Sequence, residues 1–214
     1  MNRFSYRPYY ERNLPHFQPA GATLFVTFRL AGSLPVRVIQ ELLAQSEQWT
    51  LKAQAAADSK SREMIALQAQ RALFAHWDEA LDLARAGSRW LAMPEIAALV
   101  ADAFHHLDGQ SYELLGFCVM PNHVHAVLTP LNGGDGEPQS MSAVLHSLKS
   151  FTAHEANRHL HRQGQFWQHE SYDHWVRNVK ECRRTLNYVC ANPVKAGLVE
   201  DWHDWQWTYV RELE

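Results

Sequence analysis

Two histidines stand two residues apart in the stretch PNHVHAVLTP, residues 121–130, which is otherwise typical of a buried strand. Successive side chains of a strand point to opposite faces. His123 and His125 are therefore expected to share one face, while the apolar residues between and after them enter the core. Two imidazoles side by side can give two nitrogens to one divalent cation. On this stretch alone, a pair of solvated or hydrogen-bonded histidines is an equally good interpretation.

A tyrosine and an asparagine form a second candidate pair in LNYVCANP, residues 186–193. We expect a helix here that begins after Asn178 and ends before Pro193, which places Tyr188 and Asn192 on the same helical face. An amide oxygen suits Mg²⁺ or Mn²⁺, and a His-His-Asn set leaves open positions on the cation for phosphate oxygens. Tyr188 is then a candidate nucleophile toward phosphorus, since a hydroxyl with a pKa of roughly 10 needs a neighbouring cation.

Each member of this pair also has an ordinary structural interpretation. A tyrosine on an amphipathic helix is usually half-buried, and an asparagine before a proline is a common helix end. Tyr172 is a competing nucleophile, but it falls on an expected strand and has no amide side chain four residues later.

Composition limits the class of protein. The chain has 214 residues, of which 46% are hydrophobic and 20% charged, as in an ordinary soluble globular domain. Its first residues lack the apolar segment of a signal peptide, and no apolar run approaches membrane-spanning length. The three cysteines lack CxxC spacing, so we expect reduced thiols in a cytoplasmic protein.

Charge is unevenly distributed along the chain. The formal net charge is −3, yet residues 1–30 carry four Lys/Arg against one Asp/Glu, and residues 145–199 carry eight against four. Residues 31–110 carry seven against ten. The basic ends are compatible with a local phosphate-binding surface, with the acidic helical stretch turned away from it. A mixed solvated surface is the alternative.

The periodicity of apolar residues predicts both strands and helices. Strands are expected near residues 21–30, 112–119, 123–129 and 171–176, and helices within 35–86 (two, with a break at 58–61), 94–107, 140–162 and after 178. That order predicts an α+β fold, namely a ferredoxin-like four-stranded antiparallel sheet with helices on one face. Residues 1–214 are then a single domain with a helical insertion at about 35–90.

Two motifs, MPNHVHAVLTP and YVCANPVKAGLVEDW, together resemble the REP-associated tyrosine transposases. These are relatives of the single-tyrosine HUH transposases of bacterial insertion sequences, HUH meaning His-hydrophobic-His. The segments FWQHESYDHWVRN and RWLAMPEIAALVADAFHHLDG are similar to the same family, so the resemblance spans roughly residues 20–205. The histidine pair alone is a weak signal, whereas the pair followed by Tyr-x-x-x-Asn-Pro-x-x-x-Gly is specific.

The resemblance implies that His123, His125 and Asn192 hold a divalent metal, Mg²⁺ or Mn²⁺, and that Tyr188 attacks DNA. The implied activity is a metal-dependent single-stranded DNA endonuclease and strand transferase that forms a 5′-phosphotyrosine intermediate on palindromic hairpin DNA. A hairpin-binding protein that does not cut, and a phosphodiesterase that uses water, are the alternatives. The choice between monomer and homodimer stays open.

Further DNA contacts are assigned more loosely. Lys149, Arg177 and Lys180 are candidates for phosphate or base contacts, with a solvated helix face as the alternative. Trp167 and Tyr172 are candidates for stacking on an unpaired base, with buried aromatic packing as the alternative for Trp167.

Overall fold

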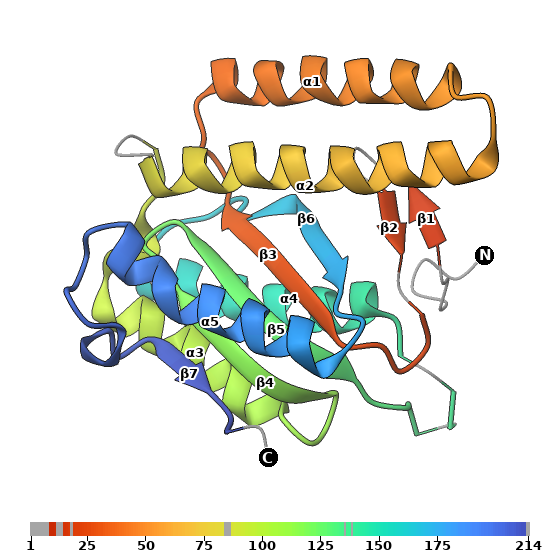
Figure 1. Cartoon of the computed structure of the whole chain (residues 1–214). Helices are drawn as coiled ribbons and strands as arrows, with labels where there is room; N and C mark the ends of the chain where they lie inside the picture. Colours follow the sequence, from red (N-terminus) through yellow and green to blue (C-terminus); the bar gives the residue numbers. More distant parts are fainter. Residues whose placement is uncertain are drawn as a thin grey trace.

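The computed structural model describes residues 9–11, 15–17, 19–83, 87–134, 136–137 and 139–212 (Figure 1). Its helices are α1 (Val36–Gln54), α2 (Ser59–Leu83), α3 (Pro94–Leu107), α4 (Met141–His159) and α5 (Val179–Lys195), with short 3₁₀ turns at Trp90–Ala92 and Trp202–Asp204. Its strands are β1 (Tyr9–Glu11), β2 (Pro15–Phe17), β3 (Leu24–Leu30), β4 (Tyr112–Val119), β5 (His123–Pro130), β6 (Trp167–Trp175) and β7 (Thr208–Val210). The expected α+β class is confirmed. Among the described residues, no helix has both the length and the apolar character needed to cross a membrane.

An antiparallel sheet with the strand order β6-β3-β5-β4-β7 forms the centre of the fold, and β1 pairs separately with β2. The expectation of four strands is wrong, because β7 pairs with residues 116–118 of β4 as a fifth strand. Its three residues are too few to show an alternating pattern in the sequence. The last strand of the expected set, β6, begins four residues earlier than its pattern indicates.

Both faces of the sheet are covered, which corrects the expectation of helices on one face. Val124, Ala126 and Leu128 of β5 enter the larger apolar core together with α3 and α4, as strand alternation predicts. The opposite face packs against α5 and against Phe74 and Trp77 of α2. The second layer forms because α5 also has an apolar stripe that has to be buried.

Helices α1 and α2 form a hairpin within the region expected to be an insertion (Figure 1). The break between them lies where the sequence indicates, since Asp58 Oδ1 accepts a hydrogen bond from the Ser61 N–H at 2.8 Å. No residue of α1 is buried, whereas α2 buries Leu73, Asp78 and Leu81 among others. The figure accordingly shows α2 between α1 and the sheet.

Helix α5 starts where expected and ends later than expected. Asn178 Oδ1 caps it by accepting a hydrogen bond from the Glu181 N–H at 2.9 Å. The helix continues through Pro193 to Lys195, so the prediction that it ends before the proline is wrong. Proline lacks an N–H, so it removes one helical hydrogen bond. The loss is small in the final turn, because carbonyl groups there often lack helical partners in any case.

Gly116 of β4 allows α5 to lie close to the sheet. A Cβ atom at this position would lie 2.8 Å from the Leu186 side chain and 2.9 Å from the Tyr209 carbonyl oxygen. Only glycine avoids both contacts without a shift of the helix or the strand. The close packing determines which way α5 turns Tyr188 and Asn192.

Candidate functional site

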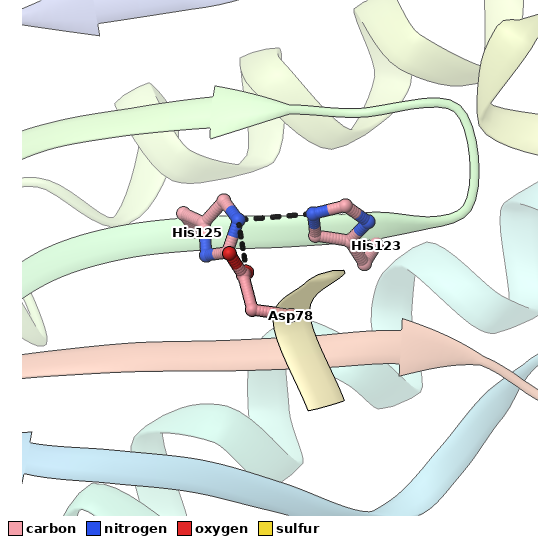
Figure 2. Close-up of side chains that lie close together, drawn as sticks. All are labelled: Asp78, His123 and His125. Carbon is pink, nitrogen blue, oxygen red and sulfur yellow. Dashed lines mark hydrogen bonds and ion pairs between the residues drawn. The ribbon is translucent and has the colours of Figure 1, made fainter. Parts of the chain in front are cut away.

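His123 and His125 lie side by side on β5, as strand alternation predicts (Figure 2). Their Nε2 atoms are 2.9 Å apart. Both residues are fully buried, at 0% exposure, so neither projects into open solvent. The pair is therefore part of the protein interior and is polar, an arrangement that needs a physical reason.

Hydrogen bonds fix the orientation of both rings. Asn122 Nδ2 donates to the Leu81 carbonyl at 2.9 Å, which turns Asn122 Oδ1 toward His123 Nδ1 at 2.6 Å. An amide oxygen only accepts, so His123 Nδ1 carries the proton and the Nε2 lone pair faces His125. The Thr27 hydroxyl lies 2.8 Å from His125 Nδ1 and holds the second ring. Outer hydrogen bonds of this kind usually support metal-binding histidines.

Burial keeps both imidazoles neutral. It lowers the pKa of His123 well below the ordinary value, and the neighbouring His125 acts in the same direction. Burial lowers the pKa of His125 to about 3, with a further contribution from the positive charge of Lys195. Neutral imidazoles have lone pairs to offer, so at physiological pH the pair is in the state that binds a cation.

Tyr188 of α5 faces the histidines, and Asn192 lies one turn further along the same helix. The Tyr188 ring lies edge-on to His125 with ring centroids 5.6 Å apart. Asn192 is fully buried, and its Nδ2 donates to the Tyr188 carbonyl at 2.8 Å. Its Oδ1 has no hydrogen-bond donor among the described residues. A buried amide oxygen without a donor is costly, and a cation would satisfy it.

Asp78 of α2 also belongs to this cluster. Its Oδ1 lies 3.3 Å from His125 Nε2, and its Oδ2 accepts a hydrogen bond from the Tyr188 hydroxyl (Figure 2 draws the contact with His125). One ligand atom from each of Asp78, His123 and His125 lies within 4.8 Å of the other two. Asp78 is buried, which overturns the expectation that the acidic helical stretch as a whole turns away from the site.

Sequence reasoning missed Asp78. The available signal is its place directly after Trp77, beside the apolar stripe of α2 that contains Leu73 and Leu81. A carboxylate beside such a stripe is usually solvated. Glu79, which follows Asp78 in the chain, is indeed exposed. The pattern alone therefore does not separate Asp78 from ordinary surface charges.

Burial and nearby negative charge hold the Tyr188 hydroxyl in the protonated form. Burial raises the pKa of Tyr188 above its ordinary value, and the charge of Asp78 and its hydrogen bond raise it further. One turn after Asp78, burial raises the pKa of Asp82 to about 7, with a contribution from the charge of Asp78. A cation near these groups would favour their ionised forms and would make the tyrosine a better nucleophile.

The atoms that meet in this cluster fit a divalent cation. Two imidazole nitrogens and a carboxylate oxygen lie together here, and this donor set suits Mn²⁺. Asp78 Oδ1 and Asn192 Oδ1 are both buried without a hydrogen-bond donor among the described residues. The residues present are thus compatible with the metal that the motifs imply.

A cavity of about 430 Å³ opens beside His123. Arg89, Lys195 and Asp82 contribute to its lining, and none of the three is among the candidate site residues predicted from the sequence. The ammonium of Lys195 lies 4.8 Å from the centre of the Tyr188 ring. Cationic side chains at the opening of a buried polar cluster suit the approach of a phosphate group.

Two of the loosely assigned DNA contacts lie away from this cluster. Lys149 is on α4, at the opposite face of the sheet, and its ammonium donates to the carbonyls of Gln168 and His169 at 2.7 and 3.3 Å. Trp167 is buried in the larger core, where its Nε1 donates to the Thr152 hydroxyl at 2.9 Å. For Trp167 the structure therefore favours the packing interpretation.

The other loosely assigned residues are on the histidine side. Arg177 is exposed just before α5, and Lys180 is exposed in its first turn. Tyr172 is buried on β6 and stacks on Phe74 with ring centroids 4.2 Å apart. The basic residues at positions 3, 7 and 12 lie outside the described residues.

No protein-family model matches the chain. Over 103 residues it is 29% identical to the REP-associated tyrosine transposase of Escherichia coli K12, a match that covers 48% of this chain and 57% of that protein. A Haemophilus influenzae protein with the same family designation is also 29% identical over 103 residues, covering 45% of this chain and 58% of that protein. The chain thus matches less than two thirds of the length of these curated relatives.

A solved structure of a REP-associated tyrosine transposase bound to a REP hairpin has a similar fold. The TM-score is 0.50 at 18% identity, and the match covers 93% of this chain and 80% of that chain. Fold and site together define an α+β protein in which an antiparallel sheet presents a His-hydrophobic-His pair to a tyrosine on a helix. The curated and structural relatives support the REP-associated tyrosine transposases as the family that this chain resembles.

Proposed function

We propose that this protein is a metal-dependent single-stranded DNA endonuclease and strand transferase that acts on palindromic hairpin DNA through a 5′-phosphotyrosine intermediate. The observation that carries the proposal is the meeting of Tyr188, the histidine pair and Asp78, which come from three elements far apart in the sequence. The names of the curated relatives and the hairpin bound to the structural relative support a transposase-like function on DNA.

Tyr188 is the nucleophile in this mechanism. Its hydroxyl oxygen attacks the scissile phosphorus, the bond from phosphorus to the 3′ oxygen breaks, and the leaving oxygen takes up a proton to become a free 3′-hydroxyl. The hydroxyl proton of Tyr188 passes to Asp78 Oδ2, which already accepts its hydrogen bond. Attack by another 3′-hydroxyl on the phosphotyrosine reverses these steps and joins a strand, so no external energy source is needed.

His123, His125 and Asn192 would hold Mg²⁺ or Mn²⁺, with Asp78 Oδ1 as an additional oxygen from α2. The bound cation supplies charge stabilisation for the non-bridging oxygens of the phosphate. The protein holds the imidazoles neutral, keeps the Tyr188 hydroxyl against them and excludes water from the cluster.

Basic side chains on the same side of the sheet would receive the DNA backbone. Arg89 and Lys195 line the cavity beside His123, where a phosphate can approach the cluster. Arg177 and Lys180 continue this basic side toward the start of α5 as proposed phosphate contacts.

The proposal extends to the organisation of the chain. The order β6-β3-β5-β4 and the helices that connect these strands are those of a ferredoxin-like unit, to which β7 and the α1–α2 hairpin are additions. We regard residues 1–214 as one HUH domain with an inserted hairpin. A DNA substrate agrees with a cytoplasmic location.

A cleavage assay tests the proposed function. A hairpin oligonucleotide with a single-stranded flank, labelled at either end, is incubated with the protein in Mn²⁺ or in EDTA. We expect Mn²⁺-dependent nicking in the flank by the wild-type protein. Tyr188→Phe should not nick, although it should bind with nearly unchanged affinity because its ring packs as before.

The same assay separates the alternatives. Nicking by Tyr188→Phe at the wild-type rate would indicate that water is the nucleophile. Binding without nicking by the wild-type protein in both Mg²⁺ and Mn²⁺ would indicate a hairpin-binding protein that does not cut. Either result would contradict the proposal.

A further inference from the structure

A second cavity, of about 150 Å³, lies between the α1–α2 hairpin and the strands β3 and β6, of which β6 is the edge of the sheet. It shares no lining residue with the cavity beside His123. Its lining includes Arg29 of β3, Phe74 and Trp77 of α2, and Tyr172 of β6. Pockets for drug-sized ligands measure roughly 300–1,000 Å³, so this one suits a single planar ring system and not a whole nucleotide or a helix.

Arg29 is a buried cation in the wall of this cavity. It is 6% exposed, and its Nη1 makes two hydrogen bonds of 3.3 Å, to the Leu30 carbonyl and the Ser33 hydroxyl. Among the described residues, no ion pair joins Arg29 to a carboxylate. A guanidinium has five N–H donors, so those that make no hydrogen bond to the described residues can bond to an occupant of the cavity.

This state of Arg29 is unfavourable for the free protein. Burial lowers the pKa of its guanidinium from the ordinary value. Burying a charge without a partner is costly unless a ligand supplies the acceptor. The side chain therefore points to a ligand with hydrogen-bond acceptors.

Aromatic rings form one part of the cavity wall, and leucine and isoleucine side chains of α1 and α2 form much of the remainder. Phe74 and Tyr172 are stacked, with centroids 4.2 Å apart, and the Trp77 ring lies 6.4 Å from Phe74. Flat apolar walls beside a guanidinium suit a planar heterocycle that has acceptors on one edge. Nucleobases have this chemistry, since they stack on aromatic side chains. Guanine presents O6 and N7 together to an arginine.

The cavity adjoins the proposed catalytic cluster through shared side chains. The ring of Phe74 lies 6.1 Å from that of Tyr188, and Trp77 directly precedes Asp78 in α2. Phe25 contacts both the cluster and the cavity. Its ring stacks on that of His125 with centroids 5.6 Å apart, and its centroid lies 6.2 Å from that of Tyr172. A base in this cavity would thus belong to a nucleotide close to the phosphate that the tyrosine attacks.

We propose that this cavity binds one unpaired purine base, with guanine preferred, from a nucleotide next to the scissile phosphate. The proposal rests on the proposed function and adds a role for the α1–α2 hairpin in choosing where the strand is cut. Guanine is preferred because both of its major-groove acceptors can pair with Arg29, whereas adenine offers one acceptor and one donor there.

Abasic substitution in the hairpin flank tests this proposal. In the Tyr188→Phe background, which prevents cleavage, each unpaired flank base is replaced in turn by an abasic site and the affinity is measured. With Arg29 intact, loss of one guanine should weaken binding roughly 5- to 150-fold, the range of a bidentate arginine–guanine contact. The Arg29→Met variant should bind the intact flank with an affinity lower by a similar factor than the protein with Arg29. Removing that guanine should not lower its affinity further.

Two further variants make the test specific. Arg29→Lys keeps the charge but cannot make the two parallel hydrogen bonds, so it should lose most of the preference for guanine. Arg37→Met removes an exposed arginine that pairs with Glu41 and should behave as wild type. Arg29→Met should melt at the wild-type temperature or above, because it removes a buried charge that lacks a partner.

Several results would overturn the base pocket. A clear fall in melting temperature for both Arg29 variants would indicate a structural role. Equal losses at every flank position, with a salt dependence shallower by about 0.7, would indicate a phosphate contact. A loss of affinity at one guanine that does not depend on Arg29 would contradict the base pocket but not the proposed function. Absence of any hairpin binding by the wild-type chain would contradict both.

Discussion

The two faces of the central sheet use the same strands in opposite ways. On one face, Val124, Ala126 and their neighbours join α3 and α4 in an apolar core. On the other, His123 and His125 are equally buried beside Asp78. The second face contains buried oxygen atoms without hydrogen-bond donors among the described residues, which lowers stability without a ligand. Buried acceptors without donors are typical of a functional site, where residues needed for activity lower the stability of the fold.

Truncation of one ring on each face should give the largest contrast. Phe104→Ala, in the apolar core, should lower the free energy of unfolding by about 3–5 kcal/mol. His125→Ala should lower it by about 1–2 kcal/mol. The smaller loss is expected because His125 is a polar group in an incompletely satisfied environment. The same change should lower metal-dependent cleavage at least about 100-fold.

Urea unfolding measures the stability of these variants, and a cleavage assay on the folded protein measures their activity. A His125→Ala variant that loses stability but not activity would show that the polar face has a structural role only.

Charge reversal at two places on α2 tests how far the polar face extends. Asp78→Lys should reduce cleavage at least about 100-fold, because an ammonium would displace the cation and the hydrogen bond to Tyr188 would be lost. Glu63→Lys is the matched control on the same helix, about 22 Å away along its axis and exposed. It should cleave at nearly the wild-type rate. Equal, small effects of both changes would place α2 outside the active site.

The gain in stability on metal binding should also distinguish the two faces, by a smaller difference in free energy than the truncations. Mn²⁺ at 100 times its dissociation constant should raise the free energy of unfolding by about 2.7 kcal/mol, because the ion binds the folded state only. His123→Ala should abolish this gain, while His106→Ala, an exposed histidine of α3, should retain it. Stabilisation that persists in His123→Ala would show that the ion binds elsewhere.

Salt dependence of DNA binding should show the smallest effects. The slope of log affinity against log salt for single strands is about 0.7 per neutralised phosphate. Arg177→Gln and Lys180→Gln should each make it shallower by no more than that amount. Lys149→Gln should leave the slope unchanged, since its ammonium is bonded to two carbonyls beyond the opposite face of the sheet. A larger effect of Lys149 than of the α5 pair would put the DNA on the other face.

The apolar face was far more predictable from the sequence than the polar one. The alternation of residues 123–130, the cap at Asn178 and the break at Asp58 are local patterns, and each gave an element close to its observed place. His123 and His125 lie side by side with the Tyr188 ring against His125, and Asn192 is bonded to the Tyr188 carbonyl. Local periodicity does not encode which helix covers a sheet face, so the role of Asp78 depends on tertiary contacts and was missed.

Smaller errors have similar causes. Strand β7 is too short for a pattern and forms because β4 offers an unpaired edge. Pro193 indicated a helix end, but its cost in the last turn is small enough for packing to outweigh it. Arg29 has the pattern of an ordinary polar residue of an alternating strand, and its burial depends on tertiary contacts that the local sequence does not encode.

The most direct test of the central claim is to locate the covalent bond to DNA. The wild-type protein is incubated with hairpin DNA and Mn²⁺, the denatured adduct is digested with protease and nuclease, and the modified peptide is sequenced by mass spectrometry. The proposed mechanism predicts a 5′-phosphate linked to Tyr188 and a free 3′-hydroxyl on the released strand. An adduct on Tyr172, or complete cleavage with no adduct at any stage, would contradict it.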